Sequence, residues 1–204
     1  MGDNETTSGS HRAAQLSRLM ILMVFVAACT TGSGNIVTET REVSAFDRVD
    51  VSSGLAVELF IESGIPTRVV SVHFDDNLLD KIRTEVVDGT LIIEANGSFT
   101  VTGAGRMVKI AVPSLTALAV SGGASVQGVG AIDQLAVQAD GGSRVDLSDL
   151  VVQGMSVVVS SGADLEVTTE TSIEGEVSGG ASLTVDGDPV TRDLDVSGGG
   201  NVSG

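Results

Sequence analysis

The sequence predicts an all-β fold: a parallel β-helix (solenoid) with coils of about 19 residues, preceded by a less regular N-terminal β region. A glycine-centred segment recurs five times in the second half of the 204-residue chain, and apolar and polar residues alternate around each glycine. The composition agrees, because 42 % hydrophobic and 19 % charged residues exclude a disordered chain.

Residues 1–28 have the features of a lipoprotein signal peptide. A polar stretch with two arginines precedes a ten-residue apolar run that ends at Ala28. At about 1.5 Å per residue, this run is too short to cross a hydrocarbon core of about 30 Å. Cys29, the only cysteine, follows Val26-Ala27-Ala28, and this segment resembles a bacterial lipobox. The alternative is an ordinary buried cysteine beside a short apolar segment.

Lipidation of Cys29 would attach the mature chain to a membrane. An acylated N-terminal cysteine carries more than one lipid chain, which is the condition for stable anchoring. We therefore expect an extracytoplasmic protein, lipid-anchored to the bacterial cell envelope, and at the outer membrane if the host is Gram-negative. Residues 29–34 are interpreted as the lipidated cysteine and a short flexible tether, Thr30-Thr31-Gly32-Ser33-Gly34.

Residues 35–113 are predicted to be β-structure of lower regularity. Alternation predicts strands at residues 36–41, 48–51, 55–62, 67–74, 83–87, 90–94 and 108–112. Asp88-Gly89 is typical of a tight turn, and the segment from Asp75 to Asp80 can begin a short helix with an Asp N-cap. We interpret this region as wider, irregular coils that begin the solenoid. The pattern leaves open whether these coils are fully parallel.

Residues 114–204 contain regular glycine-rich repeats. The repeated segments begin at Val120, Ala139, Val159, Val177 and Val196, so successive starts differ by 19, 20, 18 and 19 residues. The fourth position is always Gly, the sixth is polar and the seventh is Val or Leu. A glycine between two half-buried strands predicts a corner with positive φ or a close approach between coils. The period fits a β-helix coil, not a propeller blade of about forty residues.

Several short motifs resemble those of a known family. They are Gly32-Ser33-Gly34-Asn35, Phe46-Asp47-Arg48-Val49, Asp76-Asn77-Leu78-Leu79, Asp88-Gly89-Thr90-Leu91 and the Ser-Gly-Gly repeats. In this order they resemble the head GIN domain of putative autotransporter adhesins, over residues 34–204. The resemblance implies that residues 35–204 form a right-handed parallel β-helix of a kind often carried by bacterial lipoproteins. It supplies no catalytic residues.

Candidate catalytic groups do not form a recognisable motif. Equivalent repeat positions carry Ser121, Ser160, Ser178 and Ser197, and His73 is the only histidine after the leader. A serine nucleophile needs a base held by a third group, and alternation places His73 on the solvent side of its strand. The chain has no Trp or Tyr to serve as a sugar platform in a glycosidase or lyase. We therefore expect a non-enzyme, with no catalytic residues and no cofactor.

The formal net charge of −16 excludes a basic nucleic-acid-binding face. Calcium is the strongest ligand hypothesis, but the aspartates follow neither the EF-hand nor the Gly-Gly-x-Gly-x-Asp pattern. We therefore interpret them as a solvated surface and assign no metal site. The aspartates concerned are Asp140, Asp146, Asp149, Asp164, Asp186, Asp188, Asp193 and Asp195.

Two classes of function remain. The first is an adhesin or surface binding module, anchored through Cys29, whose long faces contact a cell-surface polymer, another cell or an envelope protein. The second is a structural or assembly protein of the envelope that forms homo-oligomers by end-to-end stacking. The second rests on the expectation that the last coil, at Gly204, leaves an edge open to pairing.

Overall fold

The computed structural model describes residues 30–65 and 67–204, so the predicted signal peptide and Cys29 lie outside the described residues. The described chain is all-β, as predicted, with a single short 3-10 helix, η1 (Leu79–Lys81). Within these residues, no helix is long and apolar enough to cross a membrane.

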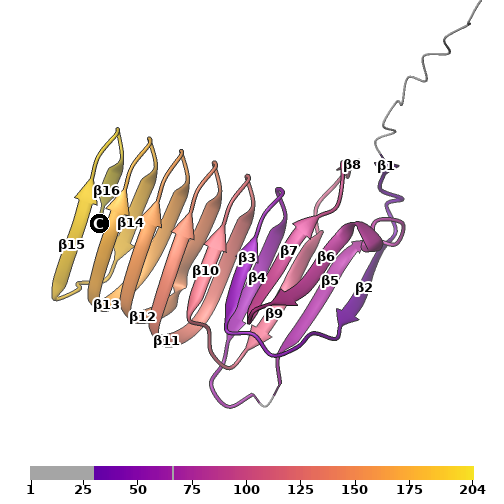
Figure 1. The fold of residues 1–204 in the computed structure, drawn as a ribbon, viewed down its shortest axis with the longest axis horizontal. Coiled ribbons are helices and arrows are strands. Elements are labelled where there is room, and N and C mark those ends of the chain that lie inside the picture. The colour runs from indigo at the N-terminus through magenta and orange to yellow at the C-terminus, as the bar shows by residue number, and fades with distance from the viewer. Residues whose placement is uncertain (1–29, 66) are drawn as a thin grey trace, which may run out of the picture.

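The strands form two facing layers joined by corner turns (Figure 1). From the C-terminal end, layer one contains β15 (Thr191–Val196), the last parts of β13 (Asp164–Val177), β12 (Arg144–Val159) and β11 (Ser125–Ala139), then β10 (Ala117–Val120), β3 (Arg48–Val51), β7 (Thr90–Ala95) and β6 (Ile82–Val87). Layer two contains β16 (Asn201–Ser203), β14 (Ser182–Asp186), the first parts of β13, β12 and β11, then β4 (Ala56–Ile61), β9 (Met107–Val112), β5 (Val69–Asp75) and β2 (Ile36–Arg41). A separate small ladder joins β1 (Thr30–Thr31) to β8 (Phe99–Thr100).

Strand pairing in the second half confirms the repeat period. The neighbouring strands are parallel, and Val145, Leu165, Leu183 and Val202 pair in succession. Their separations of 20, 18 and 19 residues equal the spacings of the corresponding repeats in the sequence. Equivalent residues of successive repeats therefore lie side by side on neighbouring strands, which stand about 4.8 Å apart in a β-sheet.

The glycine corners are tight turns whose central residues both have positive φ. In the first, Ala124 N donates to Ser121 O at 3.1 Å, with φ of +58° at Gly122 and +73° at Gly123. Gly123 N also donates to Gly141 O in the next corner at 3.1 Å. The predicted positive φ is present at all five fourth-position glycines. Two positive φ values are the signature of a type I′ turn, and the bond between corners extends the ladder around the bend.

A sixth corner was not predicted, because its segment starts at Val51, outside the spacing of the five repeats, and carries Ala56 at the polar sixth position. Ser53 and Gly54 have φ of +63° and +69°, and Ser121 N donates to Val51 O at 2.9 Å. This corner joins β3 to β4 and stacks directly against the first of the five predicted corners. The stack of parallel repeats therefore begins earlier in the chain than the glycine pattern indicates.

Aliphatic side chains fill the space between the layers. Val126, Val145, Leu165 and Leu183 are each at most 1 % exposed and occupy the same position in successive repeats. In the five predicted corners a small residue follows the glycine, whereas the sixth corner has the buried Leu55. Ser143 is the polar residue of this set, and its Oγ donates to Val120 O at 3.2 Å. The core is thus built from columns of equivalent side chains that run along the stack.

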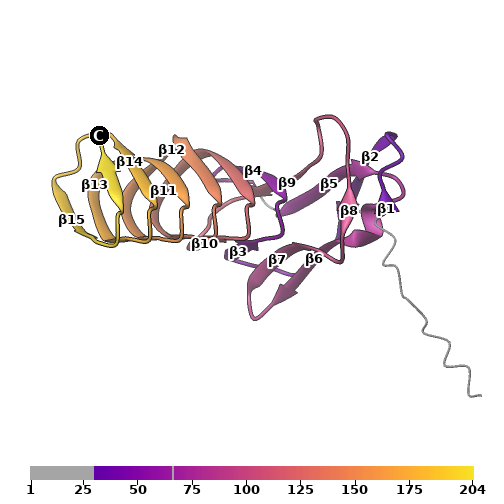
Figure 2. The same ribbon diagram turned by 90° about the horizontal axis from the view of Figure 1, so that it is seen from above.

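The N-terminal half departs from the interpretation as irregular coils. Strands β3, β4, β7 and β9 do continue the parallel stack. However, β5 runs antiparallel to both β9 and β2, and β6 runs antiparallel to β7 through the predicted Asp88-Gly89 turn. Antiparallel strands therefore complete both layers at this end, and they do so without further coils (Figure 2).

The predicted helix at Asp75 is wrong in its extent and its cap. Only the 3-10 helix η1 forms, and its N-cap is Leu78, with no side-chain hydrogen bond. Asp75 is instead fully buried and forms an ion pair with Arg106, whose side chain is 6 % exposed. Asp75 Oδ1 also accepts a hydrogen bond from Gly34 N at 2.6 Å. Its carboxylate is therefore committed to tertiary contacts.

The interpretation of residues 30–34 as a flexible tether is also wrong. Ser33 Oγ donates to Asp76 Oδ1 at 2.6 Å, and Asn35 Nδ2 donates to Asp76 Oδ2 at 3.0 Å. Ser33 N donates to Asn77 Oδ1 at 3.0 Å, while Asn77 Nδ2 donates to Thr31 O at 2.9 Å. We call the contact of residues 31–35 with residues 75–77 and Arg106 the N-terminal clasp. It fastens this segment to the folded domain.

Glycine is required where the clasp passes over its buried ion pair. A Cβ on Gly32 would lie 2.7 Å from Asp75 Cγ, which is closer than van der Waals contact, so a larger residue would displace the ion pair.

The pKa of Asp75 is lowered to about 2. The main cause is the hydrogen bonding from Arg106, and the hydrogen bond from Gly34 N acts in the same direction.

We predict that two glycine substitutions differ sharply in cost. A Cβ on Gly175, where φ is +145°, would lie 1.8 Å from Val157 O, whereas a Cβ on Gly180, where φ is +75°, meets no heavy atom within 4 Å. Gly180→Ala should cost about 1–2 kcal/mol from backbone strain alone, and Gly175→Ala about 3 kcal/mol or more because overpacking adds to it. Urea unfolding followed by circular dichroism measures both, and equal losses would contradict the packing described here.

We also predict that acid weakens the clasp. Because the pKa of Asp75 is about 2 in the folded chain and 3.8 ordinarily, its ionised form stabilises the fold above about pH 4. That contribution is lost as the pH falls through about 2. Between these limits the unfolding midpoint temperature of the unmodified protein should fall more steeply than that of Asp75→Asn. Asp188→Asn, at an exposed carboxylate, is the matched control and should follow the unmodified protein.

Candidate binding groove

The solvent face of layer two carries a groove of about 430 Å³ that crosses the strands. Its floor is the backbone at Val57, Val126 and Val145, whose side chains point into the core. Its walls are the outward residues on either side of this floor. The lining residues are Ala56, Val57, Glu58, Met107, Ser125, Val126, Gln127, Arg144, Val145, Asp146, Asp164, Glu166 and Thr184.

Two columns of mainly polar side chains supply the walls, and both columns extend past the groove, because Lys109, Ser182, Asn201 and Ser203 are not among its lining residues. Each column joins residues that pair in register on successive parallel strands, so its members recur at the strand spacing of about 4.8 Å. Column one is Ala56, Ser125, Arg144, Asp164, Ser182 and Asn201. Column two is Lys109, Glu58, Gln127, Asp146, Glu166, Thr184 and Ser203. Column one includes the sixth position that the sequence marked as always polar.

Ion pairs and short hydrogen bonds orient several wall residues. Arg144 Nη2 lies 3.2 Å from Asp164 Oδ2, and Lys109 Nζ lies 2.9 Å from Glu58 Oε2. Ser148 donates to Asp146 Oδ1 through its hydroxyl at 2.7 Å. The walls thus offer a dense row of carboxylate, amide, hydroxyl and guanidinium groups to a ligand.

An apolar row lies beside column two. Val69, Ala111, Phe60 and Val129 pair in succession across four strands. Phe60 and Val69 are each 41 % exposed and Val129 is 46 % exposed, so an aromatic ring and aliphatic groups face solvent here. The chain has no Trp or Tyr, and Phe60 supplies an exposed aromatic surface that its composition does not predict.

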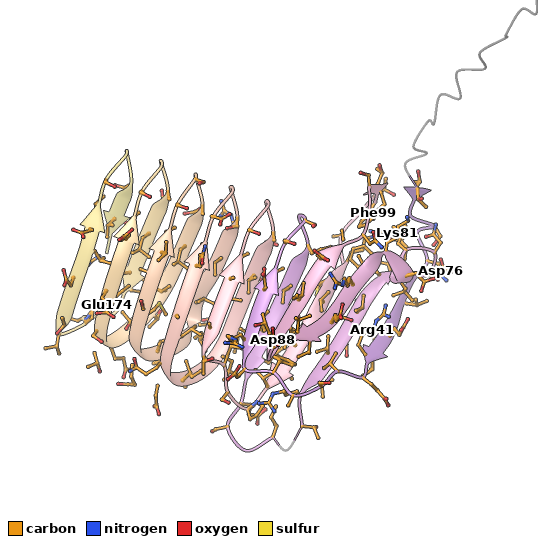
Figure 3. The ribbon with its side chains drawn as sticks, in the orientation of Figure 1. Arg41, Asp76, Lys81, Asp88, Phe99 and Glu174 are labelled. Carbon is orange, nitrogen blue, oxygen red and sulfur yellow. The ribbon has the colours of Figure 1, made fainter. Side chains whose placement is uncertain are left out.

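Layer one offers a different outer face. Its middle carries small side chains around a hollow of about 330 Å³. Towards the C-terminal end, Glu174 pairs in register with Asp193, and Glu176 with Asp195 (Figure 3). Among the described residues, no three His, Cys, Asp or Glu side chains are grouped to hold a metal ion. The aspartates considered for calcium are therefore not brought together in a described cluster.

The structure separates the candidate catalytic residues. Ser121, Ser160 and Ser178 each open a corner turn, where their carbonyls accept the turn hydrogen bond. His73 lies on β5, is partly buried, and its Nδ1 lies 2.9 Å from Thr38 Oγ1. The predicted alternation holds, because neighbouring Val72 and Phe74 point into the core.

The chain matches the model of a known family over most of the described region. The match covers residues 45–134 and 119–189, and the family is described as "Putative auto-transporter adhesin, head GIN domain". The chain belongs to this family. The resemblance to this family is thereby confirmed over residues 45–189. No curated protein matches the chain.

One solved structure of a similar protein supports the fold, and a second is more distantly similar. A putative adhesin from Bacteroides fragilis has 19 % sequence identity and a TM-score of 0.53, with 85 % of this chain and 98 % of that chain covered. A putative lipid binding protein from Parabacteroides distasonis has 18 % identity and a TM-score of 0.41, over the same shares of the two chains. At 19 % identity, the first comparison bears on the fold alone.

We predict that the groove walls can be altered without unfolding the domain. The Asp164 and Arg144 side chains are 48 % and 75 % exposed, so Asp164→Ala should change the free energy of unfolding by less than about 1 kcal/mol. The next residue, Leu165, is fully buried, and Leu165→Ala should cost about 2–5 kcal/mol. Denaturant unfolding of this neighbouring pair checks the assignment, and a large loss for Asp164→Ala would contradict it.

Proposed function

We propose that this head GIN domain is a non-catalytic surface-binding module of the bacterial cell envelope, an adhesin that holds a polysaccharide chain along the layer-two groove. The observation that carries the proposal is the arrangement of two polar columns and one apolar row in parallel across the strands. A ligand lying along the groove meets a new set of side chains at each strand. An extended polymer with repeating groups suits this surface better than a compact small molecule.

The chemistry of the groove favours a sugar polymer. Carboxylate, amide and hydroxyl groups of Asp146, Gln127 and Ser125 are suited to hydrogen bonds with ligand hydroxyls. The exposed ring of Phe60 can pack against the apolar face of a sugar ring beside them. The separation of His73 from the corner serines supports a binding role without catalysis.

We further propose that the stack is a right-handed parallel β-helix. Parallel pairing at offsets of 18 to 20 residues and the stacked corners support one coil per repeat. The antiparallel strands β2, β5 and β6 then form the N-terminal end of this β-helix.

The proposed location is outside the cytoplasm, with Cys29 as the lipid attachment site and the membrane as its partner. The order of charged stretch, apolar run and Val26-Ala27-Ala28-Cys29 supports it, as does the family's description as an adhesin. We place the protein at the outer membrane if the host is Gram-negative.

A second proposal is assembly of the envelope by end-to-end stacking. Among the described residues, β15 and β16 each pair on one side only, which leaves backbone groups available for another strand. Asp193 and Asp195 on β15 oppose pairing with an identical edge, because like charges on neighbouring strands repel. The assembly proposed is therefore head-to-tail, with β15 and β16 of one copy against the antiparallel strands of the next.

We predict that variants in column two and in the apolar row beside it lose binding while the fold is kept. Phe60→Ala and Gln127→Ala should each lower retention on fixed bacterial and epithelial cells and on a polysaccharide array at least about tenfold, because central interface residues contribute most of the binding energy. Flow cytometry and array fluorescence measure the loss. Circular dichroism verifies that each variant is folded.

The matched control is Val158→Ala on layer one, because Val158 is 44 % exposed on the opposite face. It should bind like the unmodified protein. Binding that depends on Val158 but not on Phe60 would move the site to layer one. If the molecular mass measured by light scattering grows with protein concentration, and the protein binds neither cells nor glycans, the result favours assembly.

A further inference from the structure

We infer that the N-terminal end of the domain is a membrane-facing surface, and that the clasp holds the acidic repeats away from an anionic lipid bilayer. The inference rests on the proposed lipid anchor at Cys29. It adds the orientation of the domain on the membrane, which the anchor alone does not determine. A long tether would permit any orientation, whereas a short rigid attachment permits few.

The attachment would be short because Thr30, the residue after Cys29, is already part of the described folded structure. Thr30 pairs with Phe99, and Gly32 N donates to Thr100 O at 2.8 Å. The clasp then fastens Ser33 and Asn35 to Asp76, as described above. A lipid on Cys29 would therefore bring the β1–β8 ladder to the bilayer surface.

This ladder lies at the end of the molecule opposite β15 and β16. Figures 1 and 2 both show β1 and β8 beside the antiparallel strands, at the end of the molecule away from β15 and β16. Figure 3 places Asp76 and Phe99 at the clasp end and Glu174 near the far end. Layer one has eight strands in its pairing order, which spans roughly 35 Å at about 4.8 Å per strand.

Charge is distributed unevenly along this length. Residues 114–204 contain 13 acidic and 2 basic residues, a net charge of −11, whereas residues 30–113 contain 12 acidic and 7 basic residues, a net charge of −5. At the clasp, the strands β1 and β8 carry only Thr and Phe, Asp75 is buried against Arg106, and Asp76 is an exposed carboxylate held by Ser33 and Asn35.

An anionic bilayer therefore repels the far half more strongly than the clasp half. The Debye length at physiological ionic strength is about 8 Å, well below the length of the stack. Repeats that stand away from the surface escape this repulsion, whereas repeats lying on it would not. The rigid clasp and the uneven charge therefore both favour an orientation in which the repeats point away from the bilayer. The groove on layer two then remains open to a ligand.

The test uses the full chain, expressed with its own leader, isolated from membranes and reconstituted in vesicles of phosphatidylethanolamine and phosphatidylglycerol. Acylation occupies the only native thiol, so an engineered cysteine alone accepts a fluorophore. Thr102→Cys labels the clasp end, and Asn201→Cys labels the far end. Quenching by acceptor lipids should be severalfold stronger for Thr102→Cys. A flexible Gly/Ser insertion between Cys29 and Thr30 should reduce this difference.

The possible results distinguish failure of the proposed lipid anchor from failure of the proposed orientation. Equal quenching of the two labels in acylated protein would overturn the orientation and leave the anchor intact. A mass without acyl chains, together with protein that fails to float with vesicles, would overturn the anchor itself. Strong quenching at Thr102→Cys, with a difference that the insertion removes, would support the clasp as the orienting element.

Discussion

The backbone hydrogen-bond ladder between successive repeats is the constraint on which the rest of the structure depends. In most folds a ladder stops at the end of a strand, but here Gly123 N donates to Gly141 O and continues it around the corner. That bond requires two consecutive residues with positive φ, which explains the recurring glycine pairs. The ladder also sets a fixed register, so each side-chain position becomes a column.

The register explains both the core and the groove. Because side chains alternate across a strand, the position that places Val145 in the core places Arg144 and Asp146 on the outer face. A slip of one residue between repeats would exchange the two sets, and the buried aliphatic columns oppose such a slip. The polar columns are therefore ordered by interactions on the other side of the sheet. A binding surface of this kind costs little additional stability, because its outward side chains do not determine the fold.

The features that could be predicted from the sequence are those that leave a regular pattern in it. The repeat period, the glycine corners and the limits of strands such as Ile36–Arg41 follow from patterns within a few residues, and the structure agrees with them. The clasp has no such signal, because Thr30-Thr31-Gly32-Ser33-Gly34 has the composition of a linker and its partners lie 41 to 46 residues away. The apolar row containing Phe60 is equally hidden, since it joins four strands that are not consecutive in sequence.

The two ends of the domain meet different physical demands. At the N-terminal end, an ion pair excluded from solvent and a network of short hydrogen bonds fasten the chain at one point, where looseness would cost orientation. Along the stack, equivalent outward positions carry Ser125, Arg144 or Asp164 without any change of backbone, because only the inward residues and corner glycines are constrained. Outward residues can therefore vary while the attachment is kept. The outer surface of this chain can therefore change by substitution along the columns while the ladder and the clasp stay the same.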